Sequence, residues 1–217
     1  AGFDKNGIAA NIWQDFGFGF SEIGTVTKYA QPGNPKPRLF RISNEQAALN
    51  RMGFNNNGAN LLLKNLLRQN ITKASERKTN CLGINFGKSK ITAIENATND
   101  YLSSLKLLIP YCDYAAINVS SPNTKGLRKL QDPILLKELL QEIKKLPNCP
   151  PIFVKIAPDL SFKEIDEICQ LINDENINGI IATNTSLNRL GLEDTIIKAT
   201  GSTLSNESGG LSGKPLK

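Results

Sequence analysis

The most informative absence from this 217-residue sequence is histidine, which does not occur at all. Without an imidazole, Ser-His-Asp and Cys-His catalysis are excluded and a zinc site is disfavoured. The four cysteines (Cys81, Cys112, Cys149 and Cys169) are widely spaced and form no CxxC pair. No secretion signal is recognisable, so we expect these cysteines to be reduced thiols, and we predict no metal site.

Aromatic residues and long apolar runs are also scarce. Aromatics make up only 6% of the chain, and no apolar run approaches the roughly 20 residues of a membrane-spanning helix. The formal net charge is +6, but the lysines and arginines are dispersed along the chain. A nucleic-acid surface typically has clustered cations with interleaved aromatics, so we expect no nucleic-acid partner. With 40% apolar and 21% charged residues, the composition fits a single globular domain over residues 1–217.

The second half of the sequence contains a regular alternation of strand and helix patterns. Buried-strand patterns occur at 82–88, 115–119, 152–158 and 179–185, and carry Asn85, Asn118, Lys155 and Asn184 near their carboxyl ends. Helical patterns at 94–108, 133–146 and 161–173 separate these strands. Parallel strands joined by right-handed crossovers place the four side chains on one rim. The pattern favours an α/β fold, a TIM-type (β/α)8 barrel, over a doubly wound sheet.

The first half is less regular. We expect strands at 18–27 and 39–42, the second as a hairpin strand outside the main sheet, and helices at 8–16, 44–50 and 59–69. Asn44 is expected to cap the helix at 44–50. The glycine-rich segment 209–213 reads as a loop. Five barrel strands are then visible, so three of the eight are expected to be missing from this chain.

The segment Asn118-Val119-Ser120-Ser121-Pro122-Asn123-Thr124 is the densest group of polar residues at a strand end. Ser121 needs a base or a proton relay to act. In the absence of histidine, that relay has to run through Thr124, water or substrate. The alternative interpretation is a simple polar loop.

The carboxamides of Asn50, Asn118, Asn123 and Asn184 each offer donors and acceptors. A ring of them suits a planar heterocycle such as a pyrimidine or the edge of an isoalloxazine. Because the chain is rich in asparagine, composition alone is a competing explanation for any one amide.

Lys155 stands within an apolar strand pattern, where burying an unpaired ammonium is costly. Three interpretations remain open: a structural ion pair, a Schiff-base lysine of an aldolase-like barrel, or a cation beside a flavin. Lys5 would add a cation for a substrate carboxylate.

Five segments resemble dihydroorotate dehydrogenases: Ala1–Lys5 (AGFDK), Asn50–Asn55 (NRMGFN), Asn118–Thr124 (NVSSPNT), Val154–Asp159 (VKIAPD) and Ser208–Leu216 (SGGLSGKPL). They follow one another in the order of that family, from the first residue to the last. Serine at position 121 resembles the class 2, quinone-linked branch, because the soluble class 1 enzymes carry cysteine there.

The resemblance implies oxidation of dihydroorotate to orotate in pyrimidine (UMP) biosynthesis, with FMN as cofactor and quinone as electron acceptor. Ser121 would remove the proton from C5 of the substrate, and Thr124 would help the proton leave. The implied substrate-binding residues are Lys5, Asn50, Arg51, Met52, Gly53, Phe54, Asn118, Asn123, Asn184 and Thr185. The implied cofactor-binding residues are Ala1, Gly2, Lys5, Thr25, Asn85, Asn118, Lys155, Thr183 and Gly213.

Compared with the family, the chain is expected to lack membrane-facing helices, the first barrel strand and the last two strands, so that the FMN-binding domain is truncated at both ends. The resemblance also implies a peripheral location on the cytoplasmic side of the inner membrane, reached through the absent N-terminal segment. Two alternatives are a class 1-type or other pyrimidine-acting flavin barrel and an inactive fragment that binds no flavin.

Overall fold

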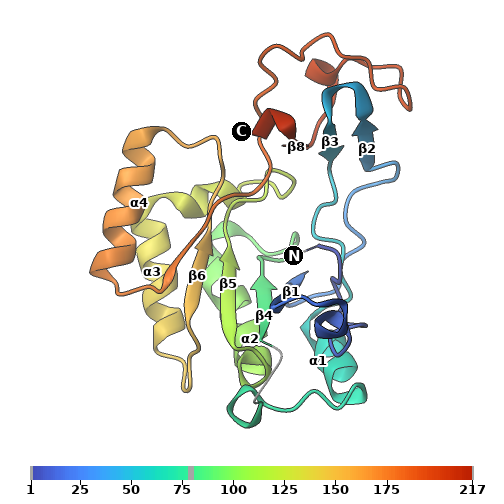
Figure 1. Ribbon diagram of the computed structural model, residues 1–217. Coiled ribbons are helices and arrows are strands. Elements are labelled where there is room, and N and C mark those ends of the chain that lie inside the picture. The colour runs from blue at the N-terminus through green and yellow to red at the C-terminus, as the bar shows by residue number, and fades with distance from the viewer. Residues whose placement is uncertain (1, 78–80, 217) are drawn as a thin grey trace.

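The centre of the molecule is a parallel sheet, seen in a computed structural model that describes residues 2–77 and 81–216. Five strands lie in the order β1-β4-β5-β6-β7 (Figure 1). They are β1 (Phe20–Val26), β4 (Cys81–Phe86), β5 (Tyr114–Asn118), β6 (Ile152–Lys155) and β7 (Gly179–Ile181). The helices between them are α1 (Ala59–Arg68), α2 (Ala97–Leu108), α3 (Pro133–Lys144) and α4 (Phe162–Asp174). The predicted α/β fold with a parallel sheet is confirmed.

The two faces of the sheet differ in chemistry because side chains alternate along each strand. One face is apolar: Ile23, Ile84 and Ile117 are fully buried in the main core with the helices. The opposite face carries Asn85 and Asn118, which are also buried. Polar groups therefore accumulate on one side of the sheet, where they have to find partners among themselves.

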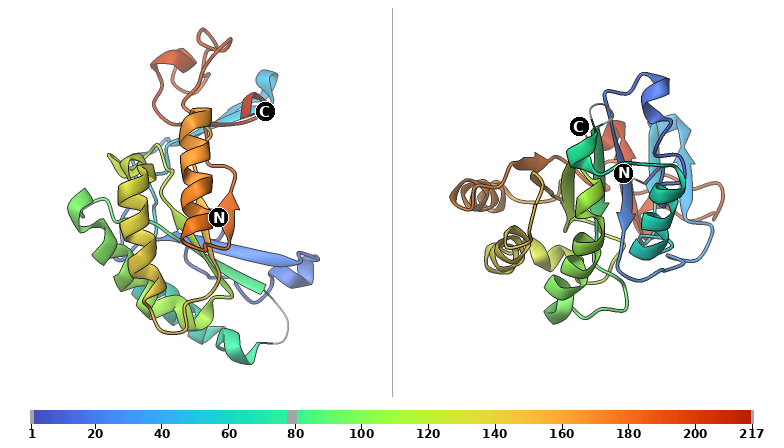
Figure 2. Two further views of the ribbon diagram at one scale, coloured as in Figure 1. Left: turned by 90° about the vertical axis from the view of Figure 1, so that its left-hand side faces the viewer. Right: turned by 90° about the horizontal axis from the view of Figure 1, so that it is seen from below.

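The helices pack in sequence order along the apolar face, each against the next (Figure 2). Asp132 caps α3 by accepting the N–H groups of Ile134 at 3.0 Å and Leu135 at 3.3 Å. A capping box opens α4, with Ser161 and Glu164 bonded reciprocally. In the part of the chain that the structure describes, no helix is long and apolar enough to span a membrane.

A second, antiparallel sheet lies beyond the carboxyl ends of the parallel strands (Figure 1). Its order is β2 (Leu39–Ile42), β3 (Ala47–Asn50) and β8 (Gly210–Gly213). It has its own small core, in which Phe40, Leu49 and Leu211 are buried. The hairpin strand predicted at 39–42 is confirmed, and it forms part of a roof over the rim of the main sheet.

Two sequence predictions in this region are wrong. Residues 44–50 form no helix: a short 3-10 turn at Ser43–Glu45 ends at Gln46, whose left-handed φ of 48° reverses the chain into β3. Pairing with β2 and β8 satisfies the backbone of β3 on both sides, which a helix of seven residues cannot match. The glycine-rich segment is strand β8 rather than a loop; a Cβ on Gly213 would lie 2.3 Å from the Gln46 carbonyl oxygen.

The ends of other predicted helices and strands differ from the observed ones, but the order of the elements in the parallel sheet and its helices is as predicted. The helix expected at 8–16 is reduced to a 3-10 turn at Trp13–Phe16, and the pattern at 94–108 begins with a 3-10 turn before α2. The strands predicted for the main sheet continue one to four residues past the observed ends, where the chain enters loops. Further 3-10 turns are Ala74–Glu76, Ile94–Asn96, Ile109–Tyr111, Leu127–Gln131, Leu204–Asn206 and Lys214–Leu216.

Candidate active site

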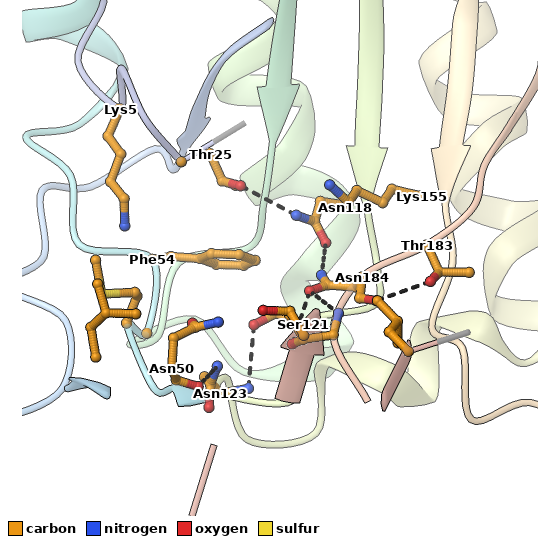
Figure 3. A pocket seen from close by; sticks show the side chains of 17 residues that line it. Lys5, Thr25, Asn50, Phe54, Asn118, Ser121, Asn123, Lys155, Thr183 and Asn184 are labelled. Carbon is orange, nitrogen blue, oxygen red and sulfur yellow. Dashed lines mark hydrogen bonds between the residues drawn. The ribbon is translucent and has the colours of Figure 1, made fainter. Parts of the chain in front are cut away.

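A cavity of about 370 Å³ lies between the carboxyl ends of the parallel strands and the antiparallel sheet (Figure 3). The structure brings together in its wall most of the residues selected from the sequence. These are Gly2, Lys5, Thr25, Asn50, Met52, Gly53, Phe54, Asn118, Ser121, Asn123, Lys155, Thr183, Asn184 and Thr185. The single rim predicted from strand spacing is therefore present.

Asn118, the last residue of β5, is the centre of a hydrogen-bonded amide network (Figure 3). Its Nδ2 donates to Asn85 Oδ1 at 3.1 Å and to Thr25 Oγ1 at 3.2 Å. Its Oδ1 accepts from Asn184 Nδ2 at 3.4 Å. Asn85 is fully buried, so it lies behind the cavity wall and acts through Thr25 and Asn118. The network fixes which side chains present a donor and which an acceptor.

The orientation of Asn85 is set from below by Glu22. Asn85 Nδ2 donates to Glu22 Oε1 at 3.0 Å, and the Tyr114 hydroxyl donates to Glu22 Oε2 at 3.1 Å. Burial and the adjacent Glu22 carboxylate hold the pKa of Tyr114 above its ordinary range, so the phenol keeps its proton. With Nδ2 of Asn85 committed to Glu22, its Oδ1 faces Thr25 and Asn118.

Ser121 lies in the loop after β5 and is 5% exposed. Its Oγ accepts the backbone N–H of Asn123 at 3.3 Å. Within residues 2–77 and 81–216, no carboxylate or amine hydrogen-bonds to this hydroxyl. The hydroxyl proton of Ser121 is thus uncommitted, and the oxygen is held at the cavity wall beside Asn50 and Asn123 (Figure 3).

Thr124 is 4% exposed and lies outside the cavity wall, three residues after Ser121. Its carbonyl oxygen accepts the N–H of Leu127 at 3.1 Å. Its hydroxyl makes no hydrogen bond to another described residue. Buried hydroxyls normally have partners. The Thr124 hydroxyl therefore retains free hydrogen-bonding capacity, which a group that passes a proton needs.

Phe54 supplies an aromatic wall in an unusual backbone conformation, with a left-handed φ of 51°. Its carbonyl accepts Asn56 Nδ2 at 2.7 Å, and the carbonyl of Gly53 accepts Gln31 Nε2 at 2.9 Å. Gly87 leaves room for the ring, since a Cβ there would lie 2.7 Å from Phe54 Cε2. These contacts hold the ring in the cavity wall (Figure 3).

Two lysines bring positive charge to the cavity. Lys155 is half-buried, is the register partner of Asn118, and its ammonium has no hydrogen bond or ion pair among the described residues. The structural ion pair left open by the sequence is therefore not seen. Lys5 Nζ donates to Asn55 Oδ1 at 2.5 Å. Two cations without carboxylate partners suit an anionic or electron-rich ligand.

Besides Asn85 and Thr124, two residues selected from the sequence lie outside the cavity wall. Arg51 pairs with Glu207 and lies 4.7 Å from the centre of the Phe40 ring, outside the cavity wall. Gly213 lies in β8 and is absent from the wall. Ala1 lies outside the described residues.

Three wall residues were not selected from the sequence as ligands: Leu39, Ser212 and Leu216. Leu39 and Ser212 belong to β2 and β8 of the antiparallel sheet. That sheet pairs segments more than 160 residues apart, as the 3.2 Å bond from Ser212 Oγ to the Ala48 carbonyl shows. Recognition of β8 as a strand that pairs with β3 would have placed Ser212 beside the rim.

Comparison with known proteins places the chain in a family. The sequence profile described as "Dihydroorotate dehydrogenase" matches residues 1–217. The chain belongs to the dihydroorotate dehydrogenase family. It is 56% identical over 217 residues to "Dihydroorotate dehydrogenase (quinone)" of Prochlorococcus marinus (strain MIT 9313), covering all of this chain and 55% of that protein. It is 51% identical over 220 residues to the protein of the same name from Nostoc punctiforme, covering 57% of it. The chain spans slightly more than half the length of these relatives.

Solved structures agree. The crystal structure of DHODH in complex with ferulenol from Eimeria tenella has a TM-score of 0.84 at 36% identity, covering 99% of this chain and 61% of that one. The ligand-free type from the same organism has a TM-score of 0.82 at 37% identity. The five parallel strands are therefore part of the barrel of dihydroorotate dehydrogenases, and the prediction of an incomplete TIM-type barrel is confirmed. This family is flavin-dependent.

The ionisation of Lys5 gives a direct test of the electrostatics of the cavity. Burial, and then the charge of Arg38, lower the pKa of Lys5 to about 8. We expect the ¹³C-NMR signal of the methylated Lys5 side chain, assigned by its loss in Lys5→Gln, to titrate near pH 8. A midpoint at the ordinary value of 10.5 would contradict this burial. Between pH 8 and 10.5 the unfolded chain keeps the Lys5 proton and the folded chain loses it. The contribution of Lys5 to the free energy of unfolding should therefore rise over this range.

Proposed function

We propose that this chain carries the chemical centre of a dihydroorotate dehydrogenase that oxidises dihydroorotate to orotate in pyrimidine (UMP) biosynthesis, and that residues 1–217 form one FMN-binding barrel domain. The observation that carries the proposal is the cavity itself. It places Ser121, with an uncommitted hydroxyl, among carboxamides and two cations that have no carboxylate partner. The relatives described as "Dihydroorotate dehydrogenase (quinone)" support the same function.

We propose FMN as the flavin. The donor set supports this choice: the unpaired ammonium of Lys155 lies next to Asn118, and Thr25 and Thr183 add hydroxyls to the same wall. When bound, the flavin supplies the acceptor for the hydride that leaves C6 of the substrate. Lys155 would hold the flavin and stabilise negative charge that develops on its reduced ring. Gly2, with no atom within 4 Å of an added Cβ, leaves open space for the ligand.

The other proposed cofactor residues act less directly or remain predictions. Asn85 orients Asn118 and Thr25 from behind the wall. Lys5 lies in the wall and is proposed for both ligands. Ala1 and Gly213 remain predictions from the family resemblance.

The proposed substrate is a six-membered ring with alternating carbonyl and N–H groups and one carboxylate, and it becomes planar on oxidation to orotate. Asn50, Asn118, Asn123 and Asn184 offer the matching donors and acceptors, and Thr185 lies beside them. The ammonium of Lys5 pairs with the carboxylate. Met52, Gly53 and Phe54 form the side wall that covers the ring. Arg51 remains a predicted ligand through the family resemblance alone.

Ser121 is the proposed base. Its oxygen takes the proton from C5 of dihydroorotate while its own hydroxyl proton passes on, through the unpaired Thr124 hydroxyl or through water. The Asn123 N–H, which already bonds Ser121 Oγ at 3.3 Å, stabilises negative charge that develops on that oxygen. Serine can act as the base without histidine because the electron pair released at C5 forms the C5–C6 double bond as the hydride leaves C6.

We propose quinone as the electron acceptor, on the basis of serine at position 121 and of the relatives named "(quinone)". A peripheral position on the cytoplasmic side of the inner membrane follows from the same proposal, because quinones dissolve in the bilayer. A soluble class 1-type enzyme is the alternative.

Replacing Ser121 by alanine tests the proposed base. In flavin-loaded protein, we expect Ser121→Ala to slow flavin reduction by dihydroorotate by about 10²- to 10⁴-fold, while flavin content and spectrum are retained. Ser121→Cys should keep partial activity with a shifted pH dependence, because a thiol serves the same role. Ser103→Ala, on the outer surface of α2, is the control. A near-normal stopped-flow rate in Ser121→Ala would refute the assignment.

Replacing Lys155 by methionine tests the proposed cation. Loss of the ammonium should weaken FMN binding and lower the two-electron reduction potential, by roughly 30 mV for each tenfold loss of preference for the reduced form. Lys163→Met, whose side chain is 85% exposed, is the matched control. An unchanged potential in Lys155→Met would show that the lysine does not act on the flavin.

The identity of the oxidant separates the two branches of the family. After reduction by dihydroorotate, we expect a soluble quinone to reoxidise the flavin at least tenfold faster than fumarate does, measured by recovery of flavin absorbance. Faster reoxidation by fumarate would favour the class 1-type alternative.

A further inference from the structure

Arg128 connects the loops that follow three neighbouring strands. It lies in the 3-10 turn Leu127–Gln131, and its guanidinium donates in three directions. Nε donates to the carbonyl of Ser120 at 3.0 Å, and Nη2 to the carbonyl of Thr185 at 3.0 Å. Nη1 pairs with Asp159 Oδ2 at 2.7 Å. The three acceptors belong to the loops after β5, β7 and β6.

Asp159 completes the connection from the opposite side. Its carboxylate accepts the Ser186 hydroxyl, and the Leu187 N–H bonds to both of its oxygens at 3.1 and 3.0 Å. Burial acts to raise the pKa of Asp159, but hydrogen bonds from Ser186, Leu187 and Arg128 lower it below the ordinary value. The carboxylate therefore stays ionised at neutral pH and bridges Arg128 to the loop after β7.

The position of these bonds matters more than their strength. The side chains of Arg128 and Asp159 are 22% and 24% exposed, and such partly exposed ion pairs contribute little to global stability. However, two of the anchored carbonyls, those of Ser120 and Thr185, lie directly beside or within the cavity wall. Arg128 itself does not line that cavity.

Another cation cannot take over this role. Arg189 is close enough to Asp159 for their charges to interact. However, its guanidinium donates its hydrogen bonds elsewhere, to the carbonyls of Ser186 and Asn188 at 3.1 Å and of Gly209 at 2.6 Å. Lysine cannot replace Arg128 either, because an ammonium on a flexible stem lacks the planar fork that reaches three divergent acceptors.

We propose that Arg128 and Asp159 form a positioning pair that sets the placement of Ser121 and Thr185 for proton removal. This proposal rests on the function proposed above for Ser121. The guanidinium fixes the carbonyl of the peptide that joins Ser120 to Ser121, and Asp159 fixes the chain immediately after Thr185. Neither side chain lines the cavity. Their effect is on the geometry of the reacting groups, where a displacement of about 1 Å costs on the order of 10²-fold in rate.

The test compares Arg128→Lys and Asp159→Asn with a pair of the same design at the other end of the sheet. Arg77 donates to Asp113 Oδ2 at 2.7 Å and to the Tyr111 carbonyl at 3.0 Å, remote from the cavity. In flavin-loaded protein, Arg128→Lys and Asp159→Asn should lower the maximal rate of flavin reduction by about 10- to 100-fold, with little change in substrate affinity. Arg77→Lys should leave that rate unchanged.

A second readout does not depend on the flavin. Hydrogen–deuterium exchange of the backbone amides at 119–125 and 184–187 should accelerate at least tenfold in Arg128→Lys and not in Arg77→Lys.

Added methylguanidine should partly restore the flavin reduction rate of Arg128→Gly. Unchanged rate and exchange in Arg128→Lys, or an equal slowing in Arg77→Lys, would overturn the proposal. If Ser121→Ala retains activity, it is instead the assignment of the base that fails.

Discussion

The structure of the cavity depends on one constraint: side chains of parallel strands that are register partners lie at the same level of the sheet and on the same face. Asn118 and Lys155 are such partners. Their face of the sheet is buried, so each amide there needs a hydrogen-bond partner. Asn85 and Asn118 satisfy one another together with Thr25. The geometry of the site thus follows from the need to pair the polar groups on this buried face. Replacing one of these side chains would remove partners from several others.

The antiparallel sheet solves a different problem, that of covering the rim. Its β3 ends at Asn50, whose carbonyl accepts Asn123 Nδ2 at 3.3 Å and so joins the roof to the loop that carries Ser121. The ion pair of Arg51 with Glu207 ties the same strand end to the segment before β8. The roof is therefore attached at one side of the loop that carries Ser121, while Arg128 bonds to the Ser120 carbonyl of the same loop. Attachment of the roof and placement of this loop therefore rest on different contacts.

Local patterns predicted the parallel strands, their connecting helices and the shared rim, because these depend on periodicities of two and 3.6 residues. Lys155 and Asn118 could be placed for the same reason. The strand at 47–50 and β8 could not be predicted, since their pairing is decided by partners far away in the chain. The amide directions of Asn85 also lay beyond the sequence, because they are set by Glu22, 63 residues earlier. The exclusion of Arg51 from the cavity wall depends on Glu207 in the same way.

The pairing of β3 with β8 has a consequence for the order of events during synthesis. The wall of the cavity includes Lys5 near one end of the described chain and Ser212 and Leu216 near the other. A ribosome releases residues in order, so the parallel strands and their helices can associate before the roof exists. Long-range pairings of this kind form late because closing the loop between them is costly in entropy. The roof therefore closes only after β8 has been made, and a chain stalled before β8 would present its polar rim to solvent.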